Sequence, residues 1–208
     1  MGRSAMGEQP GCWQGSWECG QVTAGPGTRL NSLFLDQFNE RGENMAVRKV
    51  EIERLSVRSS KPFEAVVAAL RTAVGQPDMV EFVKAIKGAR TFAELESAVH
   101  KGLGRTGLMI FMELDHGAIL HRESGLDTPK IVRFLVGNPL IMKEMAKHVP
   151  DAGSYAPVTI LVDERADGVH LTYDKMASLL APYGNPEALA IARDLDSKIE
   201  NLLRESAV

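Results

Sequence analysis

The sequence predicts an α+β fold: a single domain in which about five strands form a mixed or antiparallel sheet, with helices packed mainly on one face. Three observations predict it. Short apolar stretches of strand length recur along the chain, segments with an apolar stripe at helical spacing lie between and after them, and Asp167-Gly168 is a turn typical of an antiparallel hairpin. At 208 residues, 44% of them hydrophobic, the chain is long enough to bury one substantial core.

The expected strands are of two kinds. Residues 51–58 alternate apolar and charged side chains, as a half-buried strand does. Residues 108–114 are almost entirely apolar, which is typical of a buried strand. The remaining strands are expected at residues 130–136, 158–162 and 169–173.

The expected helices begin at residues that can satisfy free backbone N–H groups. Ser59-Ser60-Lys61-Pro62 precedes an apolar stripe over residues 63–74, which Gly75 is expected to end. Thr91-x-x-Glu94 is a capping-box pattern inside a second helical region, residues 77–104. Later helices are expected after Asp115, Gly137-Asn138-Pro139 and Asp174, and a C-terminal helix is expected at residues 186–205.

Residues 1–44 differ from the rest of the chain, because they sustain no period and hold every Cys and Trp. They are expected to be a disordered tail or a non-native extension, since Arg41-Gly42-Glu43-Asn44-Met45 matches a translated ribosome-binding site and start codon. Cys12 and Cys19 lack the spacing and the partners of a zinc or redox pair. The sequence therefore predicts one domain, residues 45–208, and no metal site.

Charge and hydropathy exclude two classes of partner. The net charge is -3 and basic residues are interleaved with acidic ones, so no basic surface for nucleic acid is expected. No run approaches the roughly 18 apolar residues of a membrane-spanning helix, and the first residues lack a signal-peptide pattern. We expect a cytoplasmic protein with neither nucleic acid nor membrane as a partner.

His116 is the strongest candidate for proton transfer. On a helix it shares a face with Glu123, seven residues later, and a nearby carboxylate would raise the pKa of the imidazole. His121 lies about 140° away from His116 on the same helix, so the two do not form a metal-binding pair. The alternative is that His116 merely lies beside the helix cap at Asp115.

Three further polar residues follow predicted strands. Asn138 either caps a helix or belongs to an anion site at that helix start. Tyr173 is expected to present its hydroxyl to a pocket, and Asp174 to cap the following helix or to contribute to the same ligand site. If the strand ends converge, His116, Asn138 and Tyr173 line one cleft.

The order of several motifs carries a family resemblance. Asp115-His116-Gly117-Ala118 follows a strand, Gly137-Asn138-Pro139 ends the next, Pro157 leads a strand ending in Asp163-Glu164, and Tyr173-Asp174 follows. In this order they resemble the small bacterial and archaeal domain-of-unknown-function family 302, over roughly residues 48–184. The resemblance implies a fold and a set of positions, and it assigns no activity, substrate or cofactor.

This chain departs from the family pattern at four places. Val136 and Thr159 stand where family members typically have Phe and Lys, and Thr172-Tyr173-Asp174 stands where they have Ser-Tyr-Asn. The helical region near residues 76–104 is also longer than the minimal pattern. The missing Lys weakens the expectation of an anion site before that strand.

The leading hypothesis is a non-catalytic domain that binds a small ligand or a partner protein and forms a homodimer. An exposed apolar face on the final helix motivates the dimer. One alternative is an enzyme that uses His116 as general base, oriented by Asp174 or Glu123. Another is a haem or tetrapyrrole carrier with a single His axial ligand. The cofactor is otherwise left unassigned.

Overall fold

A computed structural model describes residues 47–126 and 129–208. The predicted tail, residues 1–44, lies outside the described residues. Residues Arg48–Val208 form one compact unit. Within the described part of the chain, no helix combines the length and the apolar character needed to cross a bilayer.

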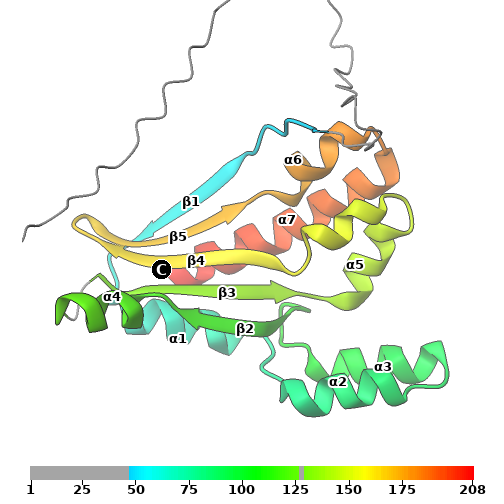
Figure 1. Ribbon diagram of the computed structural model, residues 1–208, viewed down its shortest axis with the longest axis horizontal. Coiled ribbons are helices and arrows are strands. Elements are labelled where there is room, and N and C mark those ends of the chain that lie inside the picture. The colour runs from blue at the N-terminus through cyan, green and yellow to red at the C-terminus, as the bar shows by residue number, and fades with distance from the viewer. Residues whose placement is uncertain (1–46, 127–128) are drawn as a thin grey trace, which may run out of the picture. The chain divides into compact units, whose positions relative to one another are not determined.

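The sheet has five strands, and every neighbouring pair is antiparallel. The strands are β1 (Arg54–Ser59), β2 (Met109–Asp115), β3 (Ile131–Gly137), β4 (Val158–Arg165) and β5 (Gly168–Asp174). Their order across the sheet is β1-β5-β4-β3-β2, as Figure 1 shows. The α+β class and the five strands predicted from the sequence are confirmed, and the sheet is purely antiparallel.

The helices lie between the strands and after them. They are α1 (Phe63–Ala73), α2 (Met79–Gly88), α3 (Phe92–Gly102), α4 (Gly117–Ser124), α5 (Pro139–Ala146), α6 (Met176–Leu180) and α7 (Pro186–Ala207), with 3-10 turns at Pro150–Ser154 and Ala181–Tyr183. The predicted cap at Thr91 is present, because its hydroxyl accepts the Glu94 N–H at 3.2 Å. The Glu94 carboxylate reaches back to the Arg90 N–H at 2.7 Å, one residue before the predicted partner.

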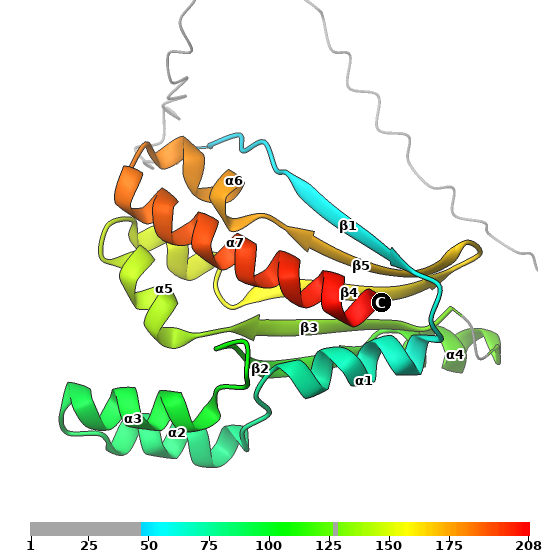
Figure 2. The same cartoon turned by 180° about the vertical axis from the view of Figure 1, so that it is seen from behind.

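One face of the sheet is covered by helices. Figure 2 shows α7 and α1 lying across this face. Its side chains are fully buried, as at Phe134 of β3 and Ile160 of β4, and they pack against Ala192 and Ile199 of α7 in one core. The apolar stripe of α7 was expected to be an exposed dimer face, and that expectation is wrong. The stripe faces the sheet, because the same spacing serves either a core or an interface.

No described helix covers the centre of the opposite face, which we call the open face (Figure 1). Its side chains are Arg54, Ser56 and Arg58 of β1, Met112 and Leu114 of β2, Ile131, Arg133 and Leu135 of β3, Thr159, Leu161, Asp163 and Arg165 of β4, and His170, Thr172 and Asp174 of β5. Most of those on β3, β4 and β5 are half-buried, because neighbouring strands shield one another even without a covering layer.

Helices α2 and α3 form a helical hairpin that leaves the sheet and returns at nearly the same point. The N–H groups of Gly75 and Gly104 both donate to the Leu108 carbonyl, each at 2.9 Å. Gly75 also accepts from the Ile110 N–H at 2.8 Å and forms a parallel bridge with Met109. Gly75 was expected to end α1 as a cap, but α1 ends at Ala73 and Gly75 pairs with the sheet.

Candidate functional site

The predicted cleft of His116, Asn138 and Tyr173 does not exist. In the β2–β3 pair, Asp115 lies opposite Val132 and Met109 lies opposite Gly137. His116 follows Asp115 and Asn138 follows Gly137, so the two residues lie at opposite ends of the sheet. The prediction failed because strands that are antiparallel neighbours end at alternate edges.

Tyr173 lies at the same end of the sheet as Asn138, but it is only 1% exposed. Its hydroxyl donates to Asp196 Oδ1 at 2.6 Å. Burial raises the pKa of the Tyr173 phenol far above its ordinary value, and the nearby Asp196 carboxylate raises it further. Tyr173 is therefore a neutral core residue rather than a group presented to a ligand.

Asp196 of α7 takes the role that was expected of Asp174. Its carboxylate accepts the Met176 N–H at 2.8 Å and the Ala177 N–H at 3.1 Å, so it caps α6 from a distant helix. Asp174 instead pairs with Arg54 across β5 and β1, with oxygen–nitrogen distances of 2.6 and 2.8 Å. The sequence signal for Asp196 is a carboxylate inside the apolar stripe of α7.

The His116 side chain forms no hydrogen bond with any residue that the structure describes, and neither a hydrogen bond nor an ion pair joins it to Glu123. The neighbouring prediction is confirmed, because Asp115 Oδ1 accepts the Ala118 N–H at 2.9 Å and caps α4. Glu123 is exposed on α4. The general-base pair is therefore not assembled in this structure.

Asn138 acts as a helix cap that also ties down a loop. Its Oδ1 accepts the Leu140 N–H at 2.8 Å, and its Nδ2 donates to the Gly107 carbonyl at 2.9 Å. Pro139 is at the first turn of α5, where its missing N–H has no cost. Gly137-Asn138-Pro139 therefore forms a helix cap, which is the first of the two interpretations given above.

We expect Asn138→Ala to lower the free energy of unfolding by about 1 to 2 kcal/mol, because both the cap and the link to Gly107 are lost. Asn138→Ser keeps a capping oxygen without the amide donor and should lie between Ala and wild type. Urea denaturation followed by circular dichroism measures the difference. Equal losses in the two variants would show that the cap contributes nothing.

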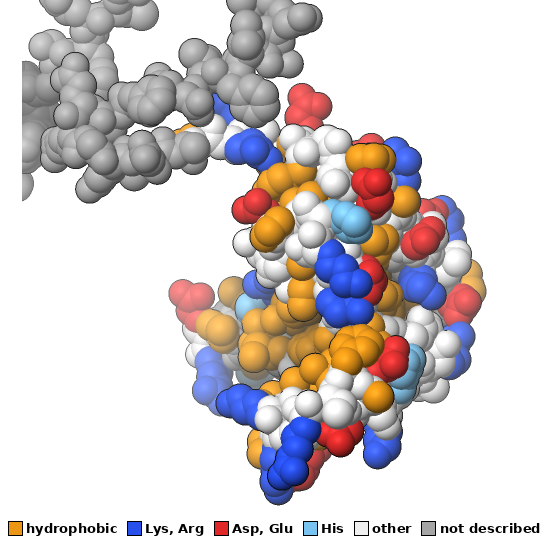
Figure 3. All heavy atoms as spheres, turned by 90° about the vertical axis from the view of Figure 1, so that its right-hand side faces the viewer, with side chains coloured by type: hydrophobic (Ala, Val, Ile, Leu, Met, Phe, Trp, Pro, Cys, Tyr) orange, Lys and Arg blue, Asp and Glu red, His pale blue; other side chains and the backbone are white. Residues whose placement is uncertain are grey.

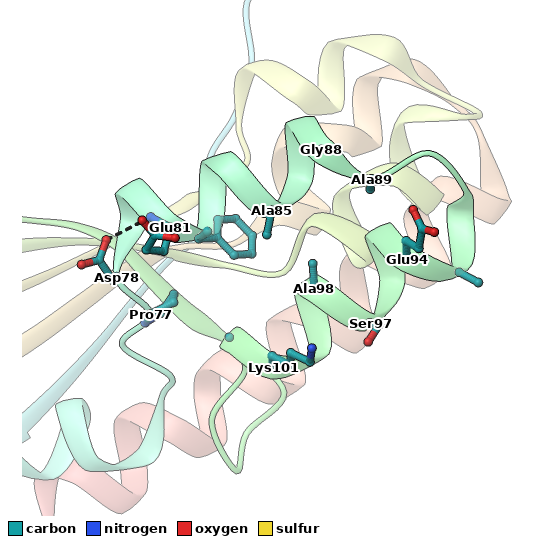
Figure 4. Close-up of a pocket in the computed structure, with 13 residues that line it drawn as sticks. Pro77, Asp78, Glu81, Ala85, Gly88, Ala89, Glu94, Ser97, Ala98 and Lys101 are labelled. Atoms are coloured by element: carbon teal, nitrogen blue, oxygen red, sulfur yellow. Dashed lines mark hydrogen bonds between the residues drawn. The ribbon is translucent and has the colours of Figure 1, made fainter.

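An open groove of about 780 Å³ runs along the helical hairpin (Figure 4). Its walls are mostly small or apolar residues, with charged groups at the ends. They are Pro77, Asp78, Glu81, Phe82, Ala85, Gly88 and Ala89 on one side and Ala93, Glu94, Ser97, Ala98, Lys101 and Gly102 on the other. Such a groove can accept an apolar surface but holds no constellation for catalysis.

A second pocket, about 470 Å³, lies between α1, α4 and the adjoining ends of β2 and β3. Arg71 forms a two-point ion pair with Glu113 there, and Lys130 pairs with Glu64 at 3.0 Å. Because these charges neutralise one another, the pocket has the character of a structural ion-pair cluster. The histidine that lines it is His121 rather than His116.

The third surface is the open face, and its central cation is Arg133. Arg133 Nη2 donates to Thr159 Oγ1 at 3.0 Å, while its Nε is buried and has no hydrogen-bond partner. Figure 3, a view from the right-hand side of Figure 1, shows a hollow in which hydrophobic side chains gather. Arg133 is not among the site residues expected from the sequence, although a lone Arg inside an apolar strand is a recognisable signal.

Groups that could ligate a metal are not brought together: within residues 47–126 and 129–208, no three His, Cys, Asp or Glu side chains cluster suitably.

Residues 84–206, more than half of the chain, match the family model described as "Domain of unknown function DUF302". The chain belongs to the DUF302 family. The resemblance identified from the order of motifs is thereby confirmed.

The DUF302 match begins within α2 and ends within α7, so it includes β2 to β5 and the helix caps Asp115 and Asn138. A crystal structure of an uncharacterized conserved DUF302 protein from Bacillus stearothermophilus has the same fold, with a TM-score of 0.52 and 16% sequence identity. The alignment covers 74% of this chain and 97% of that one. No curated protein matches the sequence. Family membership therefore establishes the fold and leaves the ligand open.

Proposed function

We propose that this DUF302 domain is a non-catalytic binding domain whose open face takes a small amphipathic anion, an apolar body ending in a carboxylate. The observation that carries this proposal is the position of Arg133. Its cation is half-buried among apolar neighbours and lacks an anionic partner among the described residues.

The other arginines of the open face are each matched to a carboxylate. Arg54 pairs with Asp174, Arg58 lies 3.8 Å from Asp167, and Arg165 pairs with Asp163. Arg133, by contrast, has only the Thr159 hydroxyl. A cation held partly out of water without a counter-charge costs free energy, and a carboxylate placed against it recovers that cost through charge-assisted hydrogen bonds.

Apolar side chains surround Arg133 on the open face. Leu114 of β2 and Leu161 of β4 are its cross-strand neighbours, and the next row carries Met112 opposite Leu135. Met112 is 50% exposed, so apolar surface is available to a ligand. A ligand that covers about 100 Å² of such apolar surface gains about 2.5 kcal/mol of binding free energy. The face thus matches a molecule with one anionic end and an apolar body.

The same residue argues against a second copy of the chain as the occupant of the open face. Two copies packed face to face about a central two-fold axis would bring their Arg133 guanidinium groups toward each other. Like charges in a partly desolvated interface repel strongly. If the domain forms the homodimer expected from its sequence, its interface lies elsewhere.

The test uses octanoate, with octanol and octyltrimethylammonium as matched controls. We expect isothermal titration calorimetry to show binding of octanoate and much weaker binding of both controls. Arg133→Gln should weaken octanoate binding by about tenfold to a hundredfold, the effect of one hydrogen bond to a charged group. Arg165→Gln, on the same face but paired with Asp163, should leave it unchanged.

Binding of octanol equal to that of octanoate, or an Arg133→Gln variant with full affinity, would contradict the proposal. Mass spectrometry of octanoate recovered after prolonged incubation checks that the ligand is chemically unchanged. Conversion of the ligand would favour the alternative of an enzyme, for which His116→Ala is the first variant to examine.

A further inference from the structure

We infer that the helical hairpin is a self-association surface through which two copies of the chain pack with their grooves face to face. The surface is separate from the open face and does not depend on the ligand proposed there. Two features carry the inference: the small residues that line the groove, and the order of charges along α3.

The two sides of the hairpin are differently occupied. The inner side packs on the sheet, where the Phe82 and Phe111 rings meet edge to face at 6.3 Å and Leu140 joins the same cluster. The outer side is the groove, and Figure 4 shows Ala85 and Ala98 directed into it from the two helices. Alanine side chains allow another helix to approach closely and pack against the first two.

The charge changes sign along the groove side of α3. Glu94 lies in its first turn and Lys101 in its last, and both line the groove. On the α2 side, the charged residues that line the groove are Asp78, the N-cap, and Glu81, and both are acidic. A second hairpin laid over the first with its helices reversed places the acidic start of each α3 against the basic end of the other.

This pattern fits a two-fold axis that runs across the helices. An isologous interface joins the same patch on both copies, so the patch must complement itself. Reversal of α3 over its own copy sets Glu94 of each copy near Lys101 of the other, and it sets the acidic start of each α2 near the uncharged Gly88 and Ala89 of the other. Parallel stacking of identical helices would instead oppose like charges.

The size of the surface sets the strength of the association. Each helix is about 15 Å long, and two side by side are about 20 Å wide. Allowing for side-chain relief, such a face buries about 500 Å² per copy, below the roughly 800 Å² of a standard interface. We therefore expect a reversible dimer with a dissociation constant of about 10 to 100 µM.

The test is a charge exchange measured by sedimentation velocity on the full chain, from about 5 µM to about 500 µM. Wild type should pass from monomer to dimer over this range. Glu94→Lys and Lys101→Glu should each raise the dissociation constant by about tenfold or more, because two attractions become two repulsions. An equimolar mixture of the two variants should regain the wild-type constant as a heterodimer.

A second pair of variants tests the interface by steric bulk, because Glu94→Lys also removes part of the capping box of α3. Ala85→Trp fills the groove and should abolish the dimer, whereas Val80→Trp, at a 76% exposed position outside the groove, should not. A monomeric wild type at every concentration overturns the inference, as does equal disruption by both Trp variants. Arg133→Gln should dimerise normally, which separates this result from the outcome of the octanoate test.

Discussion

Asp196→Ala should lower the free energy of unfolding by about 3 to 5 kcal/mol, the largest effect we expect from a single polar substitution. One carboxylate, 8% exposed, accepts hydrogen bonds from the Tyr173 hydroxyl and from the N–H groups of Met176 and Ala177. Its removal leaves all three donors without that acceptor inside the core. The Tyr173 hydroxyl cannot compensate by ionising, because burial raises the pKa of its phenol far above its ordinary value.

Urea denaturation of Asp196→Ala against wild type measures this loss. Asp194→Ala, at an exposed position of the same helix, is the matched control and should change stability by less than about 0.5 kcal/mol. Tyr173→Phe should cost only about 1 to 2 kcal/mol, because the α6 cap survives. An Asp196→Ala protein no less stable than the Asp194→Ala control would show that water replaces the carboxylate.

Gly104→Ala should destabilise the domain by about 3 kcal/mol or more, for a reason of space rather than of polarity. A Cβ atom on Gly104 would lie 2.4 Å from the Gly75 nitrogen and 2.4 Å from the Val74 carbonyl carbon. Both contacts are with backbone, so no side chain can turn aside. The two chain segments would have to separate and would lose their shared hydrogen-bond acceptor at Leu108.

Thermal unfolding by calorimetry measures the effect of Gly104→Ala. The control is Gly153→Ala, because a Cβ there meets nothing within 4 Å, and it should melt close to wild type. Gly75→Ala should resemble Gly104→Ala, since its Cβ would lie 1.9 Å from the Gly102 carbonyl oxygen. Similar melting temperatures for Gly104→Ala and Gly153→Ala would mean that the crossing can open at little cost.

Local patterns in the sequence predicted the elements well. Alternation and apolar runs gave all five strands, and Asn138 and Thr91 were recognised as caps because their partners lie two or three residues away. The role of Asp196 could not be found in this way, because its partners lie about twenty residues earlier and meet it only through tertiary packing. The apolar stripe of α7 was recognised, but its spacing does not say whether a sheet or a second molecule covers it.

The candidate site was harder to predict than the fold. Grouping His116 with Asn138 assumed that the ends of successive strands lie together, which holds for parallel strands and fails for the antiparallel β2 and β3. Arg133 lies within a run that otherwise alternates buried and half-buried apolar residues. Arg133 becomes a candidate for ligand binding only because no described helix covers the centre of its face of the sheet. A linear sequence does not reveal which face of a sheet stays uncovered.

The chain enters the α2–α3 hairpin at Gly75 and leaves it at Gly104, and these two residues lie side by side. The hairpin is therefore an insertion whose two ends meet. Since the two ends meet, the intervening segment could be shortened, lengthened or exchanged without altering strand register in the remainder of the domain. The proposed self-association, through α2 and α3, and the proposed ligand binding, on the sheet, could then change independently of each other among relatives.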